Sequence, residues 1–209
     1  MWCKRVWRDL DLSDPMNRGL STGSDATVTC GPFFDVLRFC LTEEASMTAY
    51  DPGPAGTDDR FTRSFRAAEL DSLLDRFHVE DVVGYRIKED WIFEKQSSRL
   101  VVRIIGLAPL VEVRGSDGEF RGTRVLFWAY WPECRNALAQ WPTSRALPDG
   151  SRPSYENLFS GRRFTSLVVK VSNMHDRSLH AALTGINAVR EAMKLERQLH
   201  DLERDIWHY

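Results

Sequence analysis

The chain has 209 residues, of which 43% are hydrophobic, and its 28 basic and 30 acidic residues leave a formal net charge of -2. This composition is typical of a globular protein that can bury a core. The near-neutral charge argues against a nucleic-acid or anionic-membrane partner, and no apolar run is long enough to span a bilayer directly.

Residues 1–30 are predicted to form an extended arm outside the core. The first part of this segment mixes aromatic, basic and acidic residues without clear periodicity, and the second part is rich in Ser, Thr, Gly and Asp. An aromatic-rich arm gains order most readily against a partner protein. We therefore treat Trp2, Trp7 and Arg8 as candidate partner-binding residues.

Two helices are predicted between residues 31 and 80. Pro32 opens the first, PFFDVLRFCLTEE, whose apolar residues recur at helical spacing and form one buried face. Ser64 is the expected cap of the second, FRAAELDSLLDRF. Between them the segment DPGPAGTDD, with two prolines and two glycines, is predicted to be an exposed loop.

From Val82 to Arg135 the sequence predicts an antiparallel β-meander. The run VVGYRIKEDWIFEKQ alternates with period two, and Leu100 to Val113 is apolar on both faces, as in a central strand. Asp117-Gly118 is the expected hairpin turn before a return strand from Arg124 to Trp131. Pro132 then begins a short helix.

The remainder is predicted to be mainly helical. Ser154 is the expected cap of a helix over YENLFSGRRFTSLVVKV, although the β-branched run LVVKV would also fit a strand. Asp176 is the expected cap of a long final helix that nearly reaches the C-terminus. The apolar seam of this helix shifts by about 100° between its two halves, so the helix either curves around one core or meets a second surface such as another subunit. Trp207 and Tyr209 are therefore further candidate partner-binding residues.

Patterns that would mark catalysis or metal binding are missing from the sequence. There is no P-loop, GxSxG or dinucleotide-binding glycine pattern, and the four cysteines are irregularly spaced without a CxxC pair. His175 and His180 are five residues apart and would diverge on a helix, while Glu89 and Asp90 would face opposite sides of a strand. We expect no enzyme activity, cofactor or metal. The alternative is a small-ligand-binding protein or hydrolase that uses Trp and Arg side chains around a sheet cleft.

Several strings of the sequence match those of a known family. They are KRVWR at 4–8, YRIKEDW at 85–91, VRIIGLAPL at 102–110, LFW at 126–128, WPECR at 131–135 and DIW at 205–207. Together they resemble the GldN/PorN family of the type IX secretion and gliding machinery. The resemblance extends over nearly the whole chain.

This resemblance implies a non-enzymatic structural subunit of a periplasmic ring. Its implied partners are an outer-membrane lipoprotein of the GldK/PorK type, the periplasmic region of a motor-linked protein of the GldM/PorM type, and further copies of itself within the ring. Family members are exported by a signal peptide, and no such segment follows Met1. We therefore expect a periplasmic, outer-membrane-associated protein whose signal peptide has been removed.

The expected fold is a single α+β domain over residues 1–209. It combines an antiparallel β-meander packed by several helices with a long C-terminal helix. The resemblance implies no catalytic, cofactor-binding or metal-binding residues.

Overall fold

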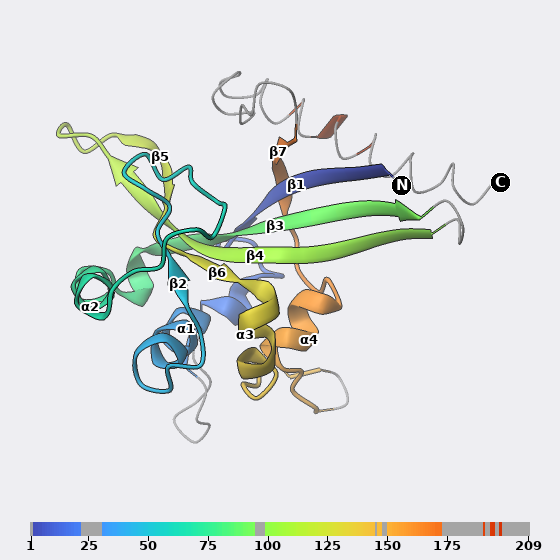
Figure 1. Cartoon of the computed structure of the whole chain (residues 1–209), viewed down its shortest axis with the longest axis horizontal. Helices are drawn as coiled ribbons and strands as arrows, with labels where there is room; N and C mark the ends of the chain where they lie inside the picture. Colours follow the sequence, from blue (N-terminus) through green and yellow to red (C-terminus); the bar gives the residue numbers. More distant parts are fainter. Residues whose placement is uncertain are drawn as a thin grey trace. The chain divides into compact units, whose positions relative to one another are not determined.

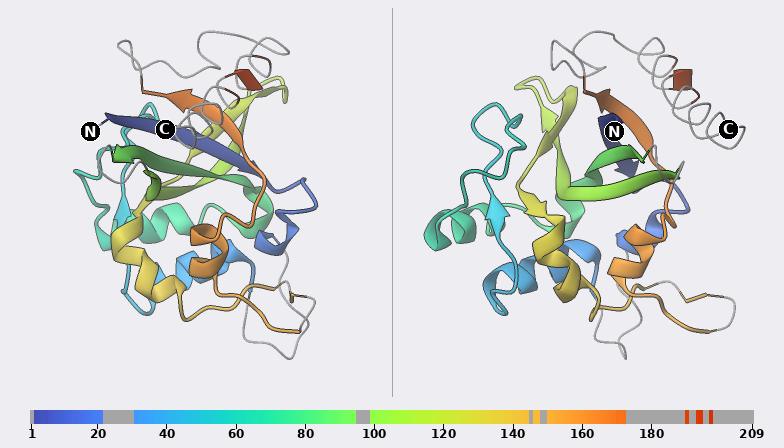
Figure 2. Two further views of the ribbon diagram at one scale, coloured as in Figure 1. Left: turned by 90° about the vertical axis from the view of Figure 1, so that its right-hand side faces the viewer. Right: turned by 45° about the vertical axis from the view of Figure 1, so that its right-hand side comes forward.

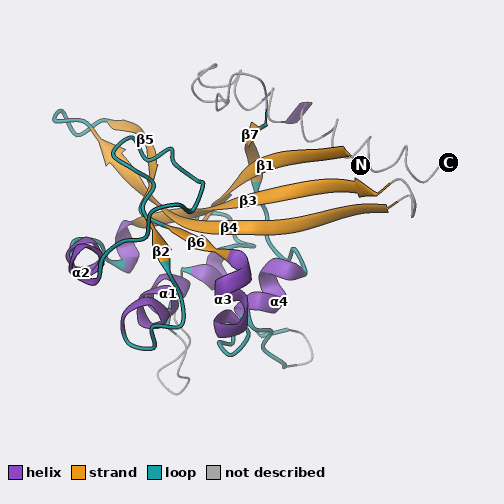
Figure 3. Cartoon of the chain, in the orientation of Figure 1, coloured by secondary structure: helices purple, strands orange, loops and turns teal. Residues whose placement is uncertain are grey.

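The computed structural model describes residues 2–21, 31–94, 99–144, 146–147, 150–172, 190, 193–194 and 197. Within these residues the fold is α+β, with seven strands in one sheet and four α-helices. The strand pairs β1–β7, β2–β6, β4–β5 and β4–β6 are antiparallel. The expected fold class is confirmed in this respect (Figure 3).

The elements follow one another as labelled in Figure 1. In chain order they are β1 (Trp2–Asp11), η1 (Arg18–Leu20), α1 (Phe33–Thr42), β2 (Ala49–Tyr50), α2 (Ala67–Leu74), η2 (Val79–Asp81), β3 (Val82–Glu94), β4 (Arg99–Arg114), β5 (Phe120–Val125), β6 (Trp128–Tyr130), α3 (Trp131–Leu138), α4 (Tyr155–Ser160) and β7 (Leu167–Val171). The strand order in the sheet is β2-β6-β4-β3-β1-β7, and β5 pairs with β4 outside this path.

The predicted meander is confirmed, with one change in its return strand. The expected strand from Arg124 to Trp131 is divided into β5 and β6, which pair with different parts of β4. The turn at Asp117-Gly118 is present, with Gly118 at a φ of 79°, a conformation that glycine adopts without strain. β5 begins at Phe120, so the hairpin is longer than expected.

The first two helices lie where the sequence places them. α1 buries six side chains on the predicted face, which are Phe33, Phe34, Val36, Leu37, Cys40 and Leu41. The predicted cap of α2 is wrong, because Ser64 forms an isolated β-bridge with Tyr50 and the helix is capped by Arg66. There the Arg66 backbone N–H donates to the Glu69 carboxylate at 3.2 Å.

The predicted helix over 155–171 is wrong in its second half. Ser154 caps α4 as expected, because its hydroxyl oxygen accepts the Asn157 N–H at 3.2 Å, but the helix ends at Ser160. The run LVVKV forms β7, which pairs with β1. The alternative interpretation of this run is therefore correct, since its β-branched residues pack well in a strand.

The predicted N-terminal arm is wrong for residues 2–11. This segment is β1, a strand inside the sheet between β3 and β7, and Val6 and Leu10 are fully buried. Charged residues occur on both of its faces, which obscures the period-two pattern in the sequence. Residues 22–30 lie outside the described residues, as does the expected C-terminal helix except for four helical residues, Arg190, Met193, Lys194 and Arg197.

The chain divides into two compact units. Unit 1 comprises 1–9, 87–105 and 166–209, and unit 2 comprises 10–86 and 106–165. The strands β1, β3 and β4 each contribute residues to both units. The expectation of one domain over residues 1–209 stays a prediction.

Each unit has its own apolar core. In unit 1, Val6 packs with Trp91, Val168 and Val171. In unit 2, Phe33 of α1 lies against Tyr85, Tyr155 and Phe159, with ring centroids 5.0, 4.5 and 5.2 Å away. Helices α1, α3 and α4 gather on one side of this unit (Figure 2).

Candidate functional site

Strand β1 in unit 1 carries two of the residues that the sequence analysis selected, Trp7 and Arg8. Side chains alternate across a strand, so these neighbours project from opposite faces. β1 pairs with β7 in antiparallel register, from Val6 opposite Val171 to Asp9 opposite Leu167, with a shift between Trp7 and Arg8. The strand therefore presents two different chemical surfaces.

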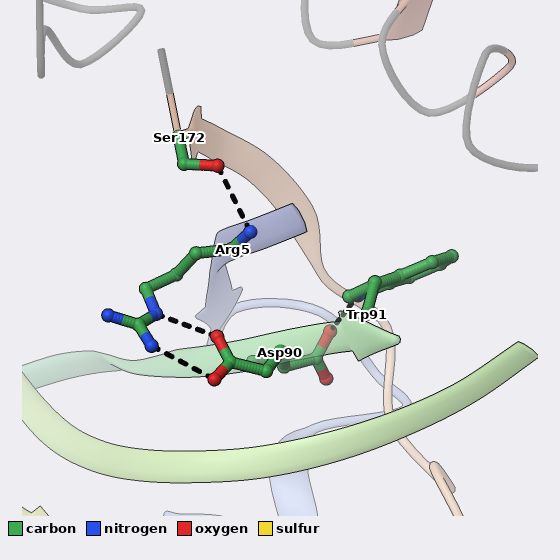
Figure 4. A network of polar contacts seen from close by, with 5 residues as sticks. Arg5, Asp90, Trp91 and Ser172 are labelled. Carbon is green, nitrogen blue, oxygen red and sulfur yellow. Dashed lines mark hydrogen bonds and ion pairs between the residues drawn. The ribbon is translucent and has the colours of Figure 1, made fainter. Parts of the chain in front are cut away.

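A bidentate ion pair joins β1 to β3. The Arg5 Nε donates to Asp90 Oδ1 at 2.7 Å, and its Nη2 donates to Oδ2 at 2.9 Å (Figure 4). The Arg5 backbone N–H donates to the Ser172 hydroxyl at 3.1 Å, and the Ser172 N–H donates back to the Arg5 carbonyl at 2.8 Å. One arginine thus links β1 both to β3 and to the residue that follows β7.

The neighbouring acid of β3 is buried in a separate contact. Glu89 is fully buried, and its Oε2 accepts the Trp91 indole N–H at 3.0 Å (Figure 4). Glu89 and Asp90 therefore make different bonds, as alternation along a strand predicts. A buried carboxylate is costly unless it is hydrogen-bonded, so this contact stabilises the local arrangement of β3.

Trp7 and Arg8 are both buried within the protein. Trp7 is only 5% exposed, with the Lys170 ammonium 4.2 Å and the Lys88 ammonium 5.8 Å from its ring centroid. The Arg8 Nε donates to the Ser166 hydroxyl at 2.8 Å. The expectation that this segment lies outside the core is wrong, and a role of Trp7 and Arg8 in binding a partner stays a prediction.

The other three candidate residues are Trp2, Trp207 and Tyr209. Trp2 belongs to β1, but its side chain lies outside the described residues, as do Trp207 and Tyr209 entirely. Their role as partner contacts also stays a prediction.

Sequence reasoning missed the residues that organise this site. They are Arg5, Lys88, Lys170 and Ser172. In the run KRVWRDLD the residues Val6, Arg8 and Leu10 lie on one face and are buried, but the arginine in this series and the equally buried Trp7 on the other face hide the alternation. The contacts of Ser172 depend on β7, and no local pattern predicts that pairing.

The titratable groups of unit 2 give no support to nucleophilic chemistry at its buried thiols. Burial raises the pKa of the Cys40 thiol to about 11 and that of the Cys134 thiol to about 12, so both are neutral near pH 7.

In the described part of the chain, no group of three or more His, Cys, Asp or Glu could hold a metal ion. No helix in this part is long and apolar enough to cross a membrane.

Comparison with known proteins gives one family. The model described as "Gliding motility associated protein GldN" matches residues 1–208. No curated protein matches the sequence. The family match includes every strand and helix described above.

Proposed function

The chain belongs to the GldN family of gliding-motility-associated proteins, and we propose that it is a non-enzymatic structural subunit of a type IX secretion and gliding ring. It acts in the periplasm, associated with the outer membrane. Its partners are a lipoprotein of the GldK/PorK type, the periplasmic region of a motor-linked protein of the GldM/PorM type, and neighbouring copies of itself.

The family match over residues 1–208 is the observation that carries this proposal. It includes both the polar contacts around β1 and the helices of unit 2, so the proposed role concerns the whole described fold. The function consists of repeated protein–protein contacts, which need rigid surfaces more than reactive groups.

The contacts around β1 supply such rigidity in unit 1. Arg5 holds β1 to β3 through two charge-assisted hydrogen bonds and to the end of β7 through its backbone. Strands tied in this way resist sliding past one another, because slippage by one residue would break each bond and reverse the faces of the strand. A strand fixed on both sides suits a subunit that must keep its shape within a larger assembly.

Co-purification tests the proposal. The full chain and the neighbouring lipoprotein are expressed together, and a tag on the lipoprotein is used for capture. We expect both proteins to elute together in a species much larger than a one-to-one pair. A folded chain that neither binds the lipoprotein nor forms a higher assembly would rule out the proposed role.

A further inference from the structure

The first part of β4, residues 99–105 in unit 1, lies at an edge of the sheet. β3 lies on one side of β4, and β6 and β5 pair with its other side, but their pairs begin only at Gly106. Among the described residues, no strand pairs with 99–105 on that side. Figure 1 shows β4 as the outer member of the long strands β1, β3 and β4. We call the unpaired side of residues 99–105 the β4 edge.

Burial along β4 changes at the point where this pairing begins. Residues 106–111 are all buried, whereas none of residues 99–105 is buried. The apolar side chains of the β4 edge are all half-buried, and they are Leu100, Val101, Val102, Ile104 and Ile105. An apolar strand that is left half-exposed along its length buries further surface when another strand is added beside it.

The backbone of the β4 edge offers an alternating row of hydrogen-bonding groups. The Pro109 carbonyl accepts the Leu126 N–H at 3.0 Å, so the backbone of Pro109 is directed away from β3. The direction of N–H and C=O groups alternates along a strand, so Val101, Arg103 and Ile105 direct theirs to the same side as Pro109. Main-chain groups of this kind are a template for another extended chain.

The two faces of the β4 edge differ in charge. Leu100 and Val102 pack against the apolar core of unit 1. Arg99 and Arg103 lie on the opposite face, because side chains alternate across a strand, and both are exposed. A strand added at this edge would therefore have an apolar surface beside one face and a basic surface beside the other.

The two arginines are not neutralised by the described acids. Residues 99–105 include Arg99 and Arg103 but no acid, and within the described part of the chain neither arginine forms an ion pair. Asp90 of β3 is already held by Arg5, which donates to both of its carboxylate oxygens at 2.7 and 2.9 Å. Acidic side chains of an added strand would be attracted to the two arginines.

These features specify the sequence of a matching strand. In an added antiparallel strand the residues opposite Arg103 and Arg99 are four positions apart, and the residues between them lie opposite 100–102. Acids fit the two outer positions, and apolar residues fit the three inner ones. β3, on the other side of β4, contains such a run, DWIFE at 90–94.

We propose that the β4 edge binds an extended segment of a partner protein, in which two acidic residues flank three apolar ones. The segment adds a strand to the sheet, with its backbone bonded to Val101, Arg103 and Ile105 and its acids beside the two arginines. A second copy that used the same edge would bring arginines together on one face, which is unfavourable. The inference goes beyond the proposed function, because a ring subunit does not require this site.

Fluorescence anisotropy measures the interaction with the full chain. The probe is a fluorescein-labelled peptide in which two glutamates flank three valines, and the control peptide has lysines in place of the glutamates. We expect saturable binding of the glutamate peptide, with a dissociation constant about tenfold lower than that of the lysine peptide. No binding of the glutamate peptide, or equal binding of the two peptides, would overturn the inference.

Charge reversal tests recognition by the two arginines. Arg99→Glu combined with Arg103→Glu should weaken binding of the glutamate peptide about tenfold and create a preference for the lysine peptide. The matched control is Arg152→Glu combined with Arg163→Glu, which changes the net charge equally at two exposed arginines of unit 2. It should leave both affinities unchanged. Equal effects of the two double variants would show that net charge alone acts, and would contradict the proposal.

Hydrogen exchange tests whether the peptide is added as a strand. With saturating glutamate peptide, the amides of Val101, Arg103 and Ile105 should exchange at least about tenfold more slowly. The amides of Leu100 and Val102, which point towards β3, should change little. Protection elsewhere in the chain, with none at these three amides, would rule out the β4 edge as the binding site.

Val101→Pro removes one N–H from the β4 edge, a change that edge strands tolerate. It should weaken peptide binding about tenfold. Two peptides N-methylated at alternate residues make the same test on the unaltered chain: one should lose binding and the other should keep it. Undiminished binding of both peptides would refute the inference. Capture by the lipoprotein does not involve this peptide, so a failure of peptide binding leaves the proposed function intact.

Discussion

Replacing Trp7 by Ala tests the placement of the N-terminal segment within the sheet. Trp7 is 5% exposed, and the Lys170 ammonium lies 4.2 Å from its ring centroid. Removing a buried Trp side chain typically costs about 3–5 kcal/mol, because the buried area is lost and a cavity remains. For a chain of this length, about 4 kcal/mol corresponds to a fall of about 8–16 °C in the thermal midpoint.

Thermal unfolding followed by circular dichroism measures this effect. Trp7→Phe is the matched control, because it keeps an aromatic ring and most of the buried area, and it should lose less than half as much. A midpoint within about 2 °C of the unaltered chain for Trp7→Ala, a change of less than about 1 kcal/mol, would refute the buried position. Residues 2–11 would then form the extended arm that the sequence alone predicts.

Three further outcomes are expected. Gly106→Ala should destabilise by about 1–3 kcal/mol in chemical denaturation, because the new Cβ would lie 2.5 Å from Phe61 Cζ; an unchanged midpoint would contradict this. In thiol labelling of the native chain Cys3 should react, whereas Cys40 and Cys134, which are buried, should react only on unfolding. The folded pKa values of these two thiols, about 11 and about 12, lie above their unfolded value. Their contribution to the free energy of unfolding should therefore be fully present below about pH 8.5 and be lost as the pH rises towards 11–12. A stability that rises over this range would show that they are not buried as neutral thiols.

Local patterns predicted the parts of the fold that depend on neighbouring residues. The apolar spacing from Phe33 to Leu41 determines a helix face by itself, and Asp117-Gly118 determines a tight turn by itself. The family resemblance, read from short strings, is confirmed by the match over residues 1–208.

Other parts depend on distant pairings that no local pattern contains. β1 and β7 stabilise each other across more than 150 residues, with Val6 opposite Val171. Taken alone, the sequence of β1 looks like an irregular arm, and the sequence of β7 looks like the end of a helix. The candidate site depends on the same pairing, since Arg5 meets Asp90 and Ser172 only when the strands are side by side.

The mass of the assembly formed with the lipoprotein tests whether this chain is a subunit of a ring. The two full proteins are co-expressed, captured through the lipoprotein, and examined by light scattering after size exclusion and by electron microscopy. We expect a closed ring with many copies of this chain. A folded chain that remains monomeric beside the lipoprotein, with no ring in the images, would contradict it.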